Sequence, residues 1–111
     1  MKKSKNIFLR KKILIYGLGK SGIASYKFLN NKANVYLFDD NLKKKIHSKL
    51  NQRLKNLKEV SKINFDKIII SPGIDISNCL LSKILKKNLS KIHTDLDIFY
   101  SFYKNKSITI T

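Results

Sequence analysis

A glycine-rich loop is the first pattern in this sequence whose residue types and spacing could do chemistry. Residues 17–22 read GLGKSG, which has the spacing G-x-G-x-x-G, and they directly follow the apolar run 13–16. In such loops the first glycine permits a tight turn, the second lets backbone approach a phosphate, and the third lets a helix pack closely on a strand. The N–H groups where that helix starts also favour an anion. We therefore predict nucleotide or diphosphate binding, with a purely structural turn as the alternative.

Two acidic residues follow the second apolar run. Asp39 and Asp40 directly follow the residues NVYLF. In dinucleotide-binding folds an acid at this point accepts a hydrogen bond from a ribose hydroxyl, and a carboxylate could equally accept from the N–H of a base. The alternative is a helix cap, since aspartate is a good N-cap residue. We expect one of the two side chains to contact a ligand.

A second loop, Ser71-Pro72-Gly73, follows the third apolar run, 68–70. Together with the GLGKSG loop it contains all of the glycine and proline in the chain. Loops at the carboxyl ends of parallel strands line the ligand crevice of an open sheet. We therefore expect the two loops to share one crevice, with a plain strand-to-loop turn as the alternative.

No catalytic or metal-binding constellation accompanies these loops. His47 and His93 have neither a cysteine nor a second histidine at metal-ligand spacing, and Cys79 is the single cysteine. We read Cys79 as a small buried hydrophobe in a reduced compartment. We predict no catalytic residue and no metal site in this chain.

The elements that must position the loops alternate between strand and helix. Continuous apolar runs at 13–16, 35–38 and 68–70 indicate strands buried on both faces, as in a parallel sheet covered by helices. The pattern predicts an α/β fold: a single Rossmann-like, doubly wound domain with a mostly parallel sheet, preceded by a basic, partly disordered tail over 1–11. Helices are predicted over 23–29, 42–57, about 80–85 and 94–103, with short strands at 91–93 and 107–111 and a weak strand at 58–63. Thr94 and Asp97 have the spacing of a capping box.

The formal net charge of +17 raises the possibility of nucleic-acid binding. However, 22 of the 24 basic residues are lysines scattered through every segment, whereas proteins that bind phosphates and bases favour arginine. We therefore expect no specific nucleic-acid partner. No apolar stretch approaches the roughly 20 residues of a membrane span, and residues 7–9 are too few for a secretory signal. We expect a cytoplasmic protein without membrane association.

Five segments in the same order carry a family resemblance: ILIYGLGKSGIAS, YLFDD, KIIISPGI, HTDLDIFY and SITIT. Together they resemble the start of the Mur ligases, most closely the members that add D-glutamate, over about residues 12–111. The resemblance implies that residues 12–105 bind the UDP part of UDP-MurNAc-L-alanine. The implied UDP-substrate-binding residues are Gly19, Lys20, Ser21, Gly22, Asp39, Asp40, Ser71, Pro72 and Gly73.

The resemblance also implies individual roles. Asp39 matches the acid that meets the uracil. Lys20 stands where an apolar residue is common, and we hypothesise that it supplies positive charge to the diphosphate. Asn41 stands where the family often has an arginine, so one base or phosphate contact of the family is not matched here.

The resemblance further implies an ATP-dependent ligase of peptidoglycan biosynthesis, whose ATP, Mg²⁺ and D-glutamate sites lie in further domains. Residues 106–111 would begin the ATP-binding domain, and the isolated 111-residue chain is expected to be an inactive, monomeric fragment that binds no cofactor itself. The alternative is a stand-alone NAD(P)-binding Rossmann module. The acid after the second strand fits that alternative, and the Ser-Pro-Gly loop fits it less well.

Overall fold

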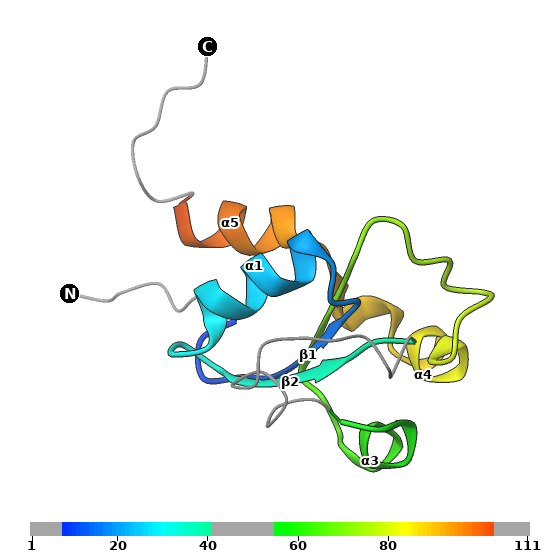
Figure 1. Cartoon of the computed structure of the whole chain (residues 1–111). Coiled ribbons are helices and arrows are strands. Elements are labelled where there is room, and N and C mark those ends of the chain that lie inside the picture. Colours follow the sequence, from blue (N-terminus) through cyan, green and yellow to red (C-terminus); the bar gives the residue numbers. More distant parts are fainter. Residues whose placement is uncertain (1–7, 41–54, 104–111) are drawn as a thin grey trace.

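Four parallel strands form the centre of the molecule in the computed structural model, which describes residues 8–40 and 55–103 (Figure 1). Helices connect the strands and pack against both faces of the sheet. The elements are β1 (Lys12–Tyr16), α1 (Lys20–Leu29), β2 (Asn34–Phe38), α3 (Leu57–Lys62), β3 (Lys67–Ile70), α4 (Ser82–Lys87), the 3₁₀ turn η1 (Leu89–Lys91), β4 (Ile92–His93) and α5 (Asp95–Tyr103).

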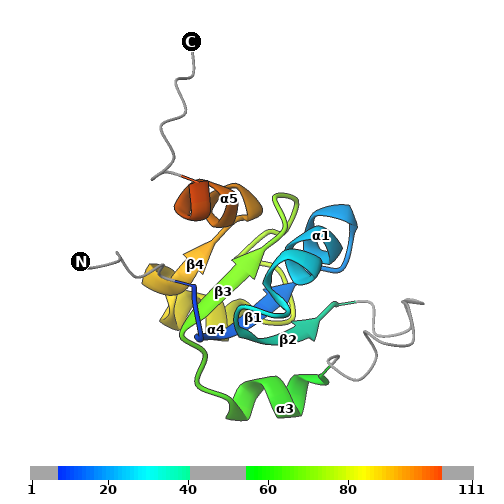
Figure 2. The same cartoon turned by 90° about the vertical axis from the view of Figure 1, so that its left-hand side faces the viewer.

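The strand order is β2-β1-β3-β4, so the chain first moves to one side of β1 and then returns to the other (Figure 2). Ile15 of β1 is paired with Leu37 of β2 on one side and with Ile69 of β3 on the other. This reversal confirms the predicted doubly wound α/β fold. The carboxyl ends of β1 and β3 lie side by side at the switch point, which is where open sheets of this kind bind ligands.

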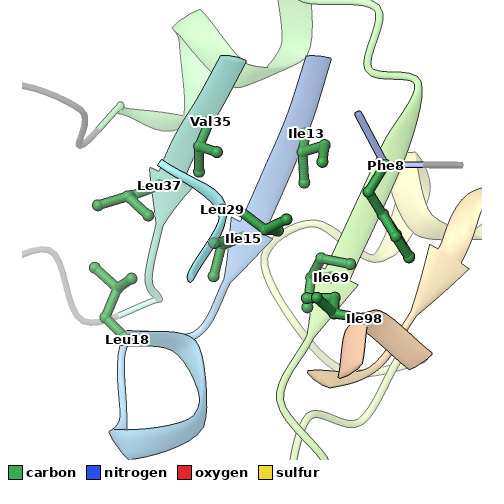
Figure 3. Packing of buried hydrophobic residues seen from close by; sticks show 9 residues of the cluster. All are labelled: Phe8, Ile13, Ile15, Leu18, Leu29, Val35, Leu37, Ile69 and Ile98. Atoms are coloured by element: carbon green, nitrogen blue, oxygen red, sulfur yellow. The ribbon is translucent and has the colours of Figure 1, made fainter. Parts of the chain in front are cut away.

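Alternate residues of each strand point to opposite faces of the sheet, and each face has its own core. On one face, α1 and α5 cover the side chains shown in Figure 3, which include Ile13 and Ile15 of β1. On the other face, α3 and α4 cover Leu14 and Tyr16. Because both faces are covered, the strands read as unbroken apolar runs, and each fully buried aliphatic side chain contributes roughly 1.5–3 kcal/mol to stability.

The weak strand predicted over 58–63 is wrong, because residues 57–62 form α3. A capping box starts this helix: Glu59 N donates to Asn56 Oδ1 at 2.8 Å, and Asn56 N donates to Glu59 Oε1 at 3.0 Å. These two bonds satisfy the backbone N–H groups of Asn56 and Glu59, which have no partner within the helix. Val60 of this helix is buried in the core of the sheet face that α3 and α4 cover.

The other predicted elements within the described residues are confirmed. The helix predicted at 23–29 begins three residues earlier, at Lys20, and the strand predicted at 91–93 is the two-residue β4. Half of the predicted capping box is present, because Thr94 N donates to Asp97 Oδ2 at 3.0 Å while Asp97 N donates to the Thr94 carbonyl. Most of the helix predicted over 42–57 and the strand predicted at 107–111 lie outside the described residues.

The packed part of the chain begins before the expected boundary at residue 12. Phe8 is fully buried in the core beneath α1 and α5, and its ring meets the imidazole of His93 edge-on, with 5.2 Å between ring centroids. Arg10 N also donates to the Lys32 carbonyl after α1. Phe8 therefore ties the segment before β1 to the far strand, β4. Within the described residues, no helix is long and apolar enough to cross a membrane.

Candidate nucleotide-binding site

Two of the three glycines in the first loop are required by the fold itself. Gly17 has φ +99°, and a Cβ atom there would lie 2.6 Å from Ser71 Oγ. A Cβ atom on Gly22 would lie 1.8 Å from the Gly17 carbonyl oxygen, so any side chain would collide with backbone. These are the tight turn and the close helix–strand approach that the spacing predicts.

Gly19 differs from the other two glycines because nothing in the fold requires it. A Cβ atom at this position would have no heavy atom within 4 Å, and its φ of −77° is open to any residue. The residue borders an open hollow of about 460 Å³ whose lining also includes Leu18, Lys20, Ile23, Ala24 and Lys27. The space beside Gly19 is therefore available to a ligand that approaches the backbone closely.

The amino end of α1 has the electrostatic character of an anion site. Its N-cap is Gly19, which has no side chain to accept from the first N–H groups, and its first turn contains no acidic residue. Lys20, the first helical residue, is exposed. Uncapped N–H groups and the positive end of the helix dipole favour a negatively charged group here.

Asp39 holds the first loop from the end of β2. Its Oδ2 accepts a hydrogen bond of 2.7 Å from Leu18 N, between the first two glycines. Gly17 N also donates to the Phe38 carbonyl at 2.8 Å. This carboxylate therefore helps to shape the glycine loop, a role that sequence reasoning did not anticipate.

Asp40 faces a different neighbour, the buried Tyr16. The Tyr16 phenol donates a 2.5 Å hydrogen bond to Asp40 Oδ1, and the phenol oxygen lies 3.5 Å from Leu81 N, just before α4. Burial, followed by the bond to Asp40, raises the pKa of Tyr16 well above its usual value. Sequence reasoning missed Tyr16, although a phenol at the end of the aliphatic run ILIY was the available signal.

The second loop contacts the first, as the shared-crevice prediction requires. Ser71 Oγ donates to the Gly17 carbonyl at 3.4 Å, and Ser71 N donates to the Tyr16 carbonyl at 3.2 Å. A turn follows, in which Ile74 N donates to the Ser71 carbonyl, leaving Pro72 and Gly73 exposed. The structure thus brings both glycine-containing loops together where β1 and β3 end.

The remaining candidate residues lie apart from these loops or outside the description. His93 packs on Phe8, and burial, with Lys67 nearby, lowers its pKa. The half-buried Cys79 thiol lies 3.7 Å from the Ile76 carbonyl oxygen. His47 and Asn41 are outside the described residues. In the ranges 8–40 and 55–103, no group of three His, Cys, Asp or Glu side chains could hold a metal ion.

Comparison with known proteins identifies the family. A family model described as the N-terminal domain of MurD-like Mur ligases matches residues 11–93, which include β1 to β4 and both loops. The chain belongs to this family. This assignment favours the Mur ligase interpretation over a stand-alone NAD(P)-binding module.

Several curated relatives of this MurD-like domain are named UDP-N-acetylmuramoylalanine--D-glutamate ligase. The protein from Rickettsia prowazekii is 34% identical over 110 residues, which cover 96% of this chain and 24% of the relative. Those from Aquifex aeolicus and Buchnera aphidicola are 34% and 35% identical, over 90% and 94% of this chain and 21% and 24% of their own lengths. The chain thus spans about a quarter of the relatives it matches. No solved structure matches it significantly.

Proposed function

We propose that this MurD-like domain binds the UDP end of UDP-MurNAc-L-alanine as the substrate-holding part of a cytoplasmic, ATP-dependent D-glutamate ligase. The observation that carries the proposal is the family match over residues 11–93, which contain two loops in contact at the switch point of the sheet. The relatives are UDP-N-acetylmuramoylalanine--D-glutamate ligases by name, and this name supplies the substrate class.

In this proposal the diphosphate lies at the amino end of α1. The backbone approaches it at Gly19, N–H groups from Lys20 and Ser21 donate to its oxygens, and Gly22 keeps the helix close to β1. Each hydrogen bond to a charged group is worth roughly 1.5–3 kcal/mol, so two or three of them are enough to anchor the ligand. The Lys20 ammonium adds a charge in the same place.

The acids and the second loop complete the proposed site. Asp39 keeps the first loop in shape through Leu18 N, and Asp40 stands exposed at the end of β2. The second wall of the proposed site is the loop Ser71-Pro72-Gly73. This loop lies beside the first one, because Ser71 Oγ donates a hydrogen bond to the Gly17 carbonyl. The site would hold the nucleotide and leave the peptide end of the substrate to extend away from the domain.

We assign the chemical step to other parts of the full-length ligase. In such a reaction, ATP phosphorylates the substrate carboxylate, the amine of D-glutamate attacks the acyl phosphate, and phosphate leaves. ATP, Mg²⁺ and D-glutamate would bind in regions beyond the matched quarter of the relatives. The contribution of this domain would be positioning, which converts a bimolecular encounter into a pre-oriented one.

Calorimetric titration of the 111-residue chain tests the proposal. UDP-MurNAc-L-alanine and UDP should bind with measurable affinity, and NAD⁺ should bind much more weakly. Repeating the titrations at two salt concentrations separates a built site from the general attraction of a chain with net charge +17 for anions. Tighter binding of NAD⁺ than of UDP would instead support the stand-alone dinucleotide module.

A further inference from the structure

We propose that the outer side of α5 is a contact surface for the region that follows this domain in the full-length ligase. Leu96 and Tyr100 define this α5 outer face. The inference rests on the part of the proposed function that makes the chain one domain of a longer ligase, and it does not depend on the binding of UDP.

The α5 outer face holds the two most exposed large apolar side chains of residues 8–40 and 55–103. Leu96 is 73% exposed and Tyr100 is 72% exposed. Residues four positions apart lie on the same face of a helix, so the two side chains form one patch. Two adjacent apolar side chains in water are a cost that a covering surface would remove.

The opposite side of α5 already packs on this domain. Ile98 is fully buried, and the ring of Phe102 meets the ring of Phe28 in the neighbouring helix α1, with 5.1 Å between ring centroids (Figure 1). The helix is therefore apolar on two sides, of which this domain covers one. A helix that is apolar all round is typical of the interior of a larger protein.

The charge pattern of α5 agrees with a covered helix. Residues 92–103 contain no lysine or arginine, although the chain has 24 basic residues. Each of the helices α1, α3 and α4 contains at least two lysines. Lysine is depleted at the centres of protein interfaces and tyrosine is enriched there. The composition of α5 is thus that of an interface, whereas the other helices have solvated surfaces.

The end of the family match indicates which region covers this face. The model of the N-terminal domain matches residues 11–93 and ends just before α5 begins. The alignment with the Rickettsia prowazekii ligase covers 96% of this chain, so it includes α5, but it covers only 24% of that relative. Because the matched domain is N-terminal, the greater part of such a ligase follows α5. A region tethered directly after the helix has a high effective concentration, so a small apolar face is enough to dock it.

Thiol labelling with iodoacetamide tests whether the α5 outer face is covered. Tyr100→Cys places a thiol on this face, and Leu57→Cys is the matched control, because Leu57 is an exposed apolar residue of α3 on the other side of the sheet. Each variant is labelled in the 111-residue chain and in a chimera, in which the chain replaces the matched part of the Rickettsia prowazekii ligase. Peptide mass spectrometry separates the new thiol from Cys79 and from cysteines of the ligase.

We expect Tyr100→Cys to react at least about tenfold more slowly in the chimera than in the chain alone, because a covered thiol reacts only during local opening. Leu57→Cys should react at the same rate in both proteins. Equal rates for Tyr100→Cys in the two proteins overturn the inference. Slow labelling of the chain alone that becomes faster on dilution also overturns it, because a second copy would then cover the face.

Two further measurements keep the test decisive. If the chimera does not fold, as judged by its thermal transition, a cysteine at the aligned position of the Rickettsia prowazekii ligase is labelled instead. A thiol there that reacts as fast as Tyr100→Cys in the chain alone overturns the inference, and a much slower one supports it. Titration of the same proteins with UDP reports the proposed substrate separately. A chimera that protects Tyr100→Cys without binding UDP would refute the proposed substrate and support this inference.

Discussion

Alanine substitutions at Gly19 and Gly22 should separate ligand binding from folding, although both glycines belong to one motif. In Gly22→Ala the new methyl group would lie 1.8 Å from the Gly17 carbonyl oxygen. That carbonyl cannot withdraw easily, because Gly17 N is bonded to the Phe38 carbonyl and Gly17 has φ +99°. In Gly19→Ala the methyl group has no heavy atom within 4 Å.

The two variants should therefore differ in stability. Overpacking costs roughly 1–3 kcal/mol and more where backbone is struck, so Gly22→Ala should destabilise the domain by about 3 kcal/mol. One kcal/mol shifts the Tm of a domain of this size by about 4–8 °C, so the Tm should fall by about 10 °C or more. Replacing glycine by alanine at an N-cap costs less than about 1 kcal/mol, so Gly19→Ala should stay within about 5 °C of the wild type.

Binding should show the reverse order where the proteins are folded. A methyl group at Gly19 occupies the space through which backbone approaches a phosphate, so UDP affinity should fall at least about tenfold, or 1.4 kcal/mol. Differential scanning calorimetry gives Tm, and calorimetric titration at a temperature where both proteins are folded gives affinity. A Gly19→Ala protein that binds UDP as tightly as the wild type would refute the placement of the diphosphate at this glycine.

Three further outcomes test the site and the fold. Lys20→Ala should weaken UDP binding about three- to tenfold and reduce its salt dependence. Lys27→Ala, which removes a lysine that lines the same hollow from the last turn of α1, should not. Equal losses of affinity would point to a general effect of charge. Asn56→Ala should lower the free energy of unfolding by about 1 kcal/mol in urea titrations, because it removes the N-cap of α3. UDP affinity should not change, because the side chain of Asn56 bonds to Glu59 N within α3 and not to either loop. No change in stability would show that the capping box does not stabilise α3. His93 has a folded-state pKa below its ordinary 6.5, mainly through burial, so the unfolded chain binds more protons below that pH. The contribution of neutral His93 to stability should be complete above pH 6.5 and should be lost as the pH falls toward the lower folded-state pKa. The Tm of His93→Gln should therefore decline less than the Tm of the wild type as the pH is lowered below 6.5. Parallel declines of the two Tm values would contradict the reasoning.

The sequence by itself determined the architecture and the location of the candidate loops. Apolar runs at 13–16, 35–38 and 68–70 predict strands buried on both faces, and glycine and proline confined to two loops mark the points where the backbone must turn tightly. These are local signals, because burial on both faces and positive φ each restrict residue type directly. The same reasoning failed at 58–63, where the apolar residues of a short segment suit a strand and a helix alike, and the Asn56–Glu59 capping box made the difference.

Only the tertiary structure decided which acid does what and how the two loops support each other. Asp39 and Asp40 are the same residue type in consecutive positions, and nothing in their spacing assigns one to Leu18 N and the other to the Tyr16 phenol. Similarly, the contact between Ser71 and Gly17 joins residues that are 54 positions apart. These interactions depend on the strand order β2-β1-β3. The physical reason is that local residue preferences restrict backbone conformation one segment at a time, whereas a hydrogen bond between segments exists only after the sheet has brought their ends together.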